Sequence, residues 1–411
     1  PGCGMGDYLA DHAHGNGDAI MDFDFDVVIN RVGTQSSKWD TMQAKYGVSP
    51  ETGIAMWVAD MDFTPPPAVN DVVRHAAIHG VHGYFGDDAD YRQALIGWMQ
   101  RRHNWHVQPN WIINAHGLCN AIGICLQAIS AAGDGVVIFS PVYHAFARII
   151  KGTDRRLVES PLIQRDGRYH MDLAKLETML TGNEKILLFC SPHNPGGRVW
   201  DEQELAELAG FCEKHDLLLV SDEVHNDLVF APAKHTVLAN AAPDISHRLV
   251  KLVATTKTFN LAGTMIGSMV TANAELRRKI VRVAAAYGTS FNRLGMMMTQ
   301  TAWRTGDAWL QALLLYLAEN RRIFEDGVNQ IAGVKAMSID ATYLCWVNFA
   351  DTGMSSDEFI RRVEAGAQIA ANHGATFGTG GASFLRFNIA CRRAHVHDAV
   401  ARLQDAFSDL Q

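Results

Sequence analysis

At residues 253–263 the chain reads Val253-Ala254-Thr255-Thr256-Lys257-Thr258-Phe259-Asn260-Leu261-Ala262-Gly263. An apolar run precedes this stretch, so we expect its lysine just beyond the end of a strand. Two other polar stretches follow apolar runs in the same way: Ser191-Pro192-His193-Asn194-Pro195-Gly196-Gly197-Arg198 and Ser221-Asp222-Glu223-Val224-His225. Together they predict a site where an amine, a carboxylate and an amide meet.

Short apolar or β-branched runs alternate with helical stretches from Trp111 to about Val270. The predicted strands are 111–115, 135–139, 156–159, 185–190, 217–221, 250–254 and 264–270, and the predicted helices are 117–132, 142–150 and 201–215. This alternation predicts an α/β fold with a mostly parallel sheet flanked by helices. Ligands of such sheets bind outside the carboxyl ends of the strands, so Asn194, Asp222 and Lys257 should share one crevice.

The C-terminal part has a different pattern. A long helix is expected from about Tyr316, followed by strands at 342–349 and 384–389 and helices at 357–371 and about 395–407. We therefore predict a smaller α+β domain at 316–411, after a large domain at 65–315. Residues 22–64 should contribute to the small domain and to an active-site loop, and residues 1–21 form a disordered leader or cloning remnant.

Composition favours a small-molecule role. The 411 residues are 48% hydrophobic and carry a formal charge of -8, which argues against nucleic acid or a membrane surface as partner. Seven scattered cysteines, an odd number, suggest reduced thiols and a cytoplasmic location. His12 and His14 could bind a metal, but a disordered segment is the preferred interpretation, and no metal is predicted.

The central residues match the chemistry of pyridoxal phosphate. A lysine amine can form an imine with an aldehyde cofactor and later move the α-proton of a substrate. The cofactor ring withdraws electrons while its nitrogen stays protonated, which calls for a buried carboxylate such as Asp222. Alone, Lys257 would be read as a surface charge and Asp222 as a helix N-cap. Their combination with Asn194 predicts the cofactor.

Further residues suit the rest of the cofactor and the substrate. Asn194 could donate to the ring oxygen, with His225 behind it, although an ordinary turn residue is an equal alternative. Phosphate could bind amides at the strand-to-helix junction of Gly117, Leu118 and Cys119, with the hydroxyl of Thr256 beside them. Tyr143 could stack on the ring, or be an ordinary buried aromatic. Arg386, in an apolar strand, could hold a substrate carboxylate or form a structural salt bridge.

These segments resemble fold-type I pyridoxal-phosphate enzymes, and more narrowly the cystathionine β-lyase/C-S lyase subgroup of class I/II aminotransferases. The narrower resemblance rests on three further motifs: Val28-Ile29-Asn30-Arg31-Val32-Gly33-Thr34 with Lys38-Trp39-Asp40, Met56-Trp57-Val58-Ala59-Asp60-Met61-Asp62-Phe63, and His79-Gly80-Val81-His82-Gly83-Tyr84. It extends from about Val27 to Arg393.

The resemblance implies a role for each matching residue. Lys257 becomes the Schiff-base lysine, and Lys257 and Tyr143 become the catalytic residues. Arg386 would hold the substrate carboxylate, with Trp57 and Tyr343 lining the pocket. Tyr84 would reach the phosphate of a neighbouring subunit, which implies a homodimer with shared active sites. The remaining cofactor contacts are those given above: Asp222, Asn194, His225, Gly117, Leu118, Cys119 and Thr256.

The sequence departs from the family at three places. Ala254 stands where relatives commonly have a small hydroxyl residue, and Thr255 could compensate. Met265 replaces a phosphate-binding arginine of many aminotransferases, which favours the lyase subgroup. Cys391-Arg392-Arg393 replaces a more usual small or Pro-containing stretch and could alter the pocket edge.

Three functions compete. The first is β-elimination from a sulfur amino acid such as cystathionine or cysteine, which gives pyruvate, ammonia and a thiol. The second is an aminotransferase, since the same residues support return of the proton to the cofactor. The third, a non-catalytic effector-binding protein, is disfavoured because Lys257, Asp222 and Asn194 are all present.

Overall fold

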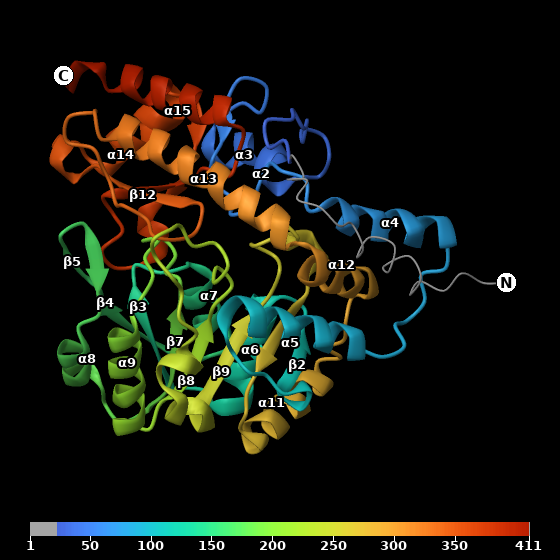
Figure 1. Ribbon diagram of the computed structural model, residues 1–411. Coiled ribbons are helices and arrows are strands. Elements are labelled where there is room, and N and C mark those ends of the chain that lie inside the picture. Colours follow the sequence, from blue (N-terminus) through green and yellow to red (C-terminus); the bar gives the residue numbers. More distant parts are fainter. Residues whose placement is uncertain (1–22, 411) are drawn as a thin grey trace.

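The computed structural model describes residues 23–410, so the predicted leader, with His12 and His14, lies outside the described residues. A seven-stranded sheet has the order β2-β10-β9-β8-β7-β3-β4 (Figure 1). Its strands are β2 (Ile112–Ala115), β3 (Gly135–Ser140), β4 (Arg156–Pro161), β7 (Glu184–Cys190), β8 (Leu218–Asp222), β9 (Leu249–Val253) and β10 (Gly267–Val270). In this sheet β10 runs antiparallel to both neighbours, and the other pairs are parallel. The predicted α/β fold with a mostly parallel sheet is confirmed.

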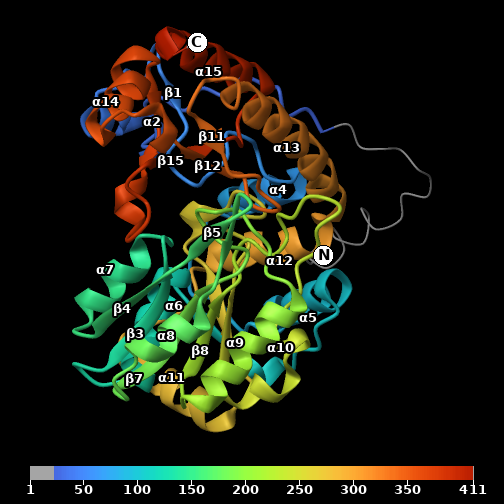
Figure 2. The same ribbon diagram turned by 90° about the vertical axis from the view of Figure 1, so that its left-hand side faces the viewer.

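Both faces of this sheet are buried because its strands are apolar at successive positions. On β7, Leu187 and Phe189 face one apolar cluster, and Ile186 and Leu188 face another. One face is covered by α6 (Leu118–Ile129), α7 (Ala145–Gly152) and α11 (Ala274–Ala286), and the other by α8 (Leu173–Met179) and α9 (Glu202–Lys214). Figure 2 shows the strands between these helices. Burial on both faces is what holds a parallel sheet together.

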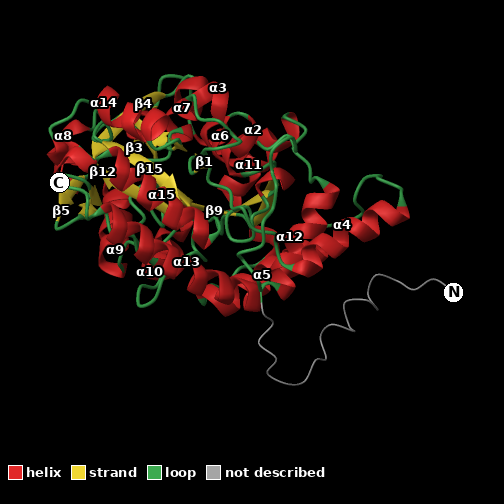
Figure 3. Ribbon diagram, turned by 90° about the horizontal axis from the view of Figure 1, so that it is seen from above, coloured by secondary structure: helices red, strands yellow, loops and turns green. Residues whose placement is uncertain are grey.

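A smaller antiparallel sheet lies beside the large one, with the order β11-β12-β15-β14. Its strands are β11 (Lys335–Ala336), β12 (Leu344–Asn348), β14 (Asn372–His373) and β15 (Phe384–Asn388). The helices α13 (Asp307–Val328) and α15 (Arg393–Ala406) pack against each other at this end of the molecule, as Figure 3 shows from above. The division into domains stays a prediction.

The expected helix at 357–371 is wrong in its second half. Helix α14 (Ser356–Arg361) passes into a π-helical turn (Arg362–Gly366), and the chain then forms β13 (Ile369–Ala370). Strand β13 pairs in parallel with β1 (Ile54–Ala55), which lies more than 300 residues earlier. A distant partner decides this segment, so local periodicity could not show it.

The long helix expected from about Tyr316 begins earlier than predicted. Helix α13 starts at Asp307, directly after Gly306, where α12 (Arg293–Thr305) ends. Gly306 separates the two helices, and a Cβ at this position would meet the Phe259 ring and the Ala302 carbonyl. The helix therefore crosses the proposed boundary at 315/316.

The remaining elements connect these layers. The helices are α2 (Ser37–Asp40), α3 (Met42–Tyr46), α4 (Pro67–His79), α5 (Ala89–His103) and α10 (Leu238–Ala241). A hairpin is formed by β5 (Ile163–Arg165) and β6 (Arg168–His170). The 3-10 turns are 109–111, 243–248, 262–264, 350–352, 374–377 and 408–410. Every helix within residues 23–410 is too short or too polar to span a bilayer. The six cysteines in this range are free thiols, and all but Cys119 are buried.

Candidate active site

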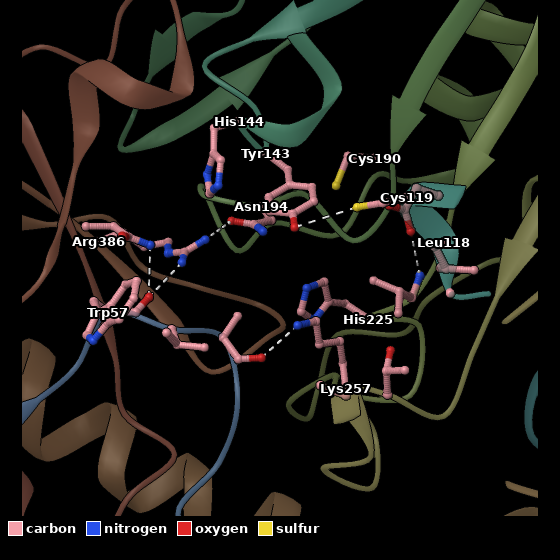
Figure 4. A pocket seen from close by; sticks show the side chains of 18 of the residues that line it. Trp57, Leu118, Cys119, Tyr143, His144, Cys190, Asn194, His225, Lys257 and Arg386 are labelled. Carbon is pink, nitrogen blue, oxygen red and sulfur yellow. Dashed lines mark hydrogen bonds between the residues drawn. The ribbon is translucent and has the colours of Figure 1, made fainter. Parts of the chain in front are cut away.

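A cavity of about 510 Å³ opens at the carboxyl ends of β7, β8 and β9, where the small sheet faces the large one. Figure 4 shows that its side chains come from both sheets and from the segment around Trp57. The predicted site residues that line it are Trp57, Gly117, Leu118, Cys119, Tyr143, Asn194, Asp222, His225, Thr256, Lys257 and Arg386. Residues far apart in the sequence thus meet in one place.

Lys257 follows β9 by four residues and points its amine across the cavity. Its Nζ donates to the carbonyl oxygen of Ala59 over 2.7 Å. Burial, and then the positive charge of Arg386, lower the pKa of Lys257 to about 8, although Asp60 and Asp222 act in the opposite direction. A lysine with this pKa is neutral in about one molecule in ten at pH 7, far more often than an ordinary lysine, so it can accept a proton.

Asp222 is the last residue of β8 and is 5% exposed. Its carboxylate accepts one hydrogen bond, from the backbone amide of Val224 at 3.2 Å, and has no side-chain donor among residues 23–410. Burial raises the pKa of Asp222 to about 6. A buried carboxylate in this position is stabilised by a cationic hydrogen-bond donor that enters the cavity.

Arg386 reaches the same cavity from β15 and is 2% exposed. Its Nη1 donates to Oδ1 of Asn194 and its Nη2 to the carbonyl oxygen of Trp57, each over 2.9 Å. The Nε atom has no partner, and no carboxylate of the described chain forms an ion pair with this guanidinium. Burial lowers the pKa of Arg386 to about 10. An incoming carboxylate would supply the missing negative charge.

The first turn of α6 borders the cavity at its other end. Gly117 caps this helix with φ +76°, a conformation that favours glycine. The amides of Leu118 and Cys119, in the first turn of the helix, have no partner within it, so they are donors for an anion. The hydroxyl of Thr256 lies on the same cavity wall.

Three side chains lie between these ends. Because an arginine can only donate, Asn194 accepts from Arg386 through its oxygen and keeps its amide nitrogen as a donor. His225 is buried, its Nδ1 has no partner, and burial holds its pKa well below the usual value, so the ring is neutral. Burial raises the pKa of Tyr143, whose hydroxyl lies 4.0 Å from Sγ of Cys119.

Comparison with known proteins identifies the family. The model of the family described as aminotransferase class I and II matches residues 54–403. The chain belongs to this family. It is 34% identical to cystathionine beta-lyase PatB of Bacillus subtilis, over 93% of this chain and 100% of the relative.

Solved structures of family members superpose closely on the chain. Cystalysin from Treponema denticola, whose crystal structure contains pyridoxal 5'-phosphate, matches with a TM-score of 0.91 and 34% identity over 95% of this chain and 100% of that one. The PLP-bound C-S lyase from Staphylococcus hominis matches with a TM-score of 0.86 and 26% identity over 94% and 98%. The resemblance to fold-type I enzymes and the C-S lyase subgroup is confirmed.

Two of the predicted site residues lie elsewhere. Tyr343 is fully buried and does not line the cavity, because its hydroxyl donates to the carbonyl oxygen of Ala59 over 2.9 Å. The carbonyl oxygen of Ala59 therefore accepts hydrogen bonds from both Tyr343 and Lys257. Tyr84 is fully exposed and is not part of the cavity wall of its own chain.

The departures from the family pattern have clear positions. Thr255 does not compensate for Ala254, because its buried hydroxyl lies 3.0 Å from that of Thr299 and away from the cavity. Met265 does line the cavity and is 55% exposed. Cys391 is buried outside the cavity. Contrary to the expectation for the 391–393 stretch, this residue therefore does not contribute to the pocket edge.

Several residues of the cavity lining were not predicted from the sequence. Among them are Lys45, Tyr46, His144, Asn372 and Thr376. Lys45 and Tyr46 lie directly after the Lys38-Trp39-Asp40 motif, which was a usable signal. Asn372 and Thr376 follow the predicted helix at 357–371, in a stretch for which the sequence predicted no element and no site.

Proposed function

We propose that this protein is a pyridoxal 5'-phosphate-dependent C-S β-lyase that acts on thioether amino acids. The observation that carries the proposal is the meeting of Lys257, Asp222 and Arg386 in one cavity, where neither the buried acid nor the buried guanidinium forms an ion pair with a described residue. The similarity to cystathionine beta-lyase PatB and to PLP-bound C-S lyases supports the same activity.

The residues present fit the cofactor. Asp222 needs a cationic donor, which a protonated pyridine nitrogen provides. The free amide nitrogen of Asn194 suits an anionic ring oxygen, and the amides of Leu118 and Cys119 with the Thr256 hydroxyl suit a phosphate. Lys257 supplies the amine for covalent attachment. When bound, the cofactor withdraws electrons from the α-carbon of the substrate.

Residues of this chain then act at separate steps of the elimination. Arg386 holds the α-carboxylate and so orients the Cα–H bond toward the amine of Lys257. Nζ of Lys257 takes the α-proton, and the bond between Cβ and sulfur breaks with its electron pair leaving on the thiolate. The released enamine takes up one water and gives pyruvate and ammonia, so the products are a thiol, pyruvate and ammonia.

The direct test is pyruvate release. Purified enzyme incubated with L-cystathionine and no keto acid should release pyruvate, whereas a strict requirement for a keto-acid acceptor would indicate the aminotransferase alternative. Lys257→Ala should abolish both turnover and the absorbance of the imine between the lysine and the cofactor. No pyruvate from any thioether substrate would overturn the proposal.

We also infer a homodimer that shares its active sites. Val28, Ile78, Val81 and Tyr84 are apolar or aromatic and at least 63% exposed. A second copy that covers them would place Tyr84 against a neighbouring cavity, as the family resemblance implies. A cytoplasmic location stays a prediction that the free cysteines support.

A further inference from the structure

The cavity wall opposite the first turn of α6 is built around Trp57. Its indole nitrogen donates to the carbonyl oxygen of Lys38 over 2.8 Å. The backbone carbonyl oxygen of Trp57 accepts hydrogen bonds from Nη2 of Arg386 and from the side-chain amide of Asn372, each over 2.9 Å. With 7% exposure and fixed contacts at both ends, this indole is a rigid surface.

Tyr46 supports the same surface from the side. Its ring meets the Trp57 ring edge to face, with centroids 5.2 Å apart. Its hydroxyl donates to Oδ1 of Asn372 over 2.8 Å, so Asn372 links Tyr46 to the backbone of Trp57. Helix α3, which carries Tyr46, ends at Gly47 with φ +67°.

Lys45 extends from this helix over the indole. Its Nζ lies 4.2 Å from the centroid of the Trp57 ring, and the residue lines the cavity. It forms no salt bridge with any carboxylate of residues 23–410 and is exposed. A lysine without an acidic partner, held by a cation–π contact at a cavity wall, can receive an anion.

Lys45 and Arg386 both contact Trp57, one at the ring and the other at the backbone carbonyl. The two cations are thus separated by about one side chain, and Figure 4 shows Trp57 and Arg386 on the side of the cavity opposite Leu118. The phosphate end is therefore distinct from this wall. Among the described lining residues Asp222 is the one acid, against Lys45, Lys257 and Arg386.

We propose that Lys45 over Trp57 forms a second anion subsite, which selects thioether amino acids whose departing thiol carries a carboxylate. This inference rests on the proposed lyase function. Arg386 holds the α-carboxylate, and Lys45 holds the distal one, beyond the sulfur. The ring of Trp57 contacts the apolar chain between them.

The test compares two substrates of equal size, S-(2-carboxyethyl)-L-cysteine and S-(2-carbamoylethyl)-L-cysteine, which differ in the charge of the distal group. Pyruvate release gives kcat/KM for each. Lys45→Met should lower the ratio of carboxylate to amide substrate roughly fivefold, the effect of losing one partly exposed charge contact. Taking the ratio between proteins cancels the intrinsic leaving-group difference.

Two controls sharpen the result. Lys45→Arg keeps a cation over the indole and should keep the preference, while Lys151→Met removes an exposed lysine outside the cavity and should change nothing. The preference of the unaltered enzyme should weaken as salt rises, because exposed charges are screened.

Failure of the subsite and failure of the proposed function look different. An unchanged substrate ratio in Lys45→Met, with pyruvate still released from both substrates, would overturn the subsite alone. No pyruvate from either substrate with the unaltered enzyme would overturn the lyase function and the subsite with it.

Discussion

Nη1 of Arg386 lies 2.9 Å from Oδ1 of Asn194, and this hydrogen bond joins the small sheet to the loop after β7. The proposed holder of the substrate carboxylate therefore also orients the proposed donor to the cofactor ring. The proposed substrate contact and the proposed cofactor contact are thus joined by one hydrogen bond.

Replacing Arg386 should weaken catalysis through substrate binding. Arg386→Gln removes a buried charged donor, and the loss of about 3 kcal/mol corresponds to a fall in kcat/KM on the order of 100-fold. This fall in kcat/KM should come mainly from a higher KM, measured by pyruvate release. Retained cofactor absorbance serves as the control, and an unchanged KM would contradict the assignment.

Asp222 should destabilise the cofactor-free protein. Burial raises its pKa from 3.8 to about 6, so the folded state binds more protons than the unfolded state between these values, and stability falls as pH rises through this window. Above pH 6 the cost is about 3 kcal/mol. In the cofactor-free form, Asp222→Asn should raise the free energy of unfolding by that order at pH 8.

The gain from Asp222→Asn should shrink to roughly half at pH 5, where the unaltered carboxyl is already mostly protonated in the folded state. Urea unfolding of the cofactor-free proteins at both pH values measures this. The same variant should lose lyase activity with cofactor present. A gain that does not depend on pH would contradict the assigned cause.

A second buried carboxylate, Asp227, should stabilise the loop that carries Lys257. It accepts from Thr258 at 2.8 Å, from His103 at 2.7 Å and from Trp98 at 3.0 Å. Although burial opposes ionisation, the contacts of His103 and Thr258 hold the pKa of Asp227 below its usual range.

Asp227→Ala leaves these donors unsatisfied and should cost about 3 kcal/mol of unfolding free energy, measured by urea titration. The exposed Asp405 offers a matched control, since Asp405→Ala should change stability by less than about 0.5 kcal/mol. Equal effects of the two substitutions would refute the role of the buried contacts.

Shared active sites predict complementation between inactive variants. Tyr84→Ala and Lys257→Ala should each be poorly active alone. In a mixed dimer, the subunit with Tyr84→Ala keeps its own Lys257 and receives an intact Tyr84 from its partner. Mixing, unfolding and refolding the two variants together should therefore restore activity, approaching one competent site per mixed dimer. No recovery, with mixed dimers verified by mass, would contradict a shared site.

The sequence alone determined the large sheet and the centre of the site. Burial on both faces makes each strand of a parallel sheet a short apolar run, which can be read locally, and polar residues after such runs must meet at one edge. Asn194, Asp222 and Lys257 could be placed together for this reason. The chemical demands of a cofactor aldehyde and a ring nitrogen then singled out the amine and the acid.

Only the tertiary structure decided the wall that faces the substrate. Ile369–Ala370 form a strand because Ile54–Ala55 lie beside them, and Tyr343 is buried behind the cavity lining, where the Ala59 carbonyl accepts its hydroxyl. Lys45 enters the site because Trp57 lies beneath it. Each depends on a contact with a distant segment, and a local pattern can show that a residue is buried but not which distant residue it meets.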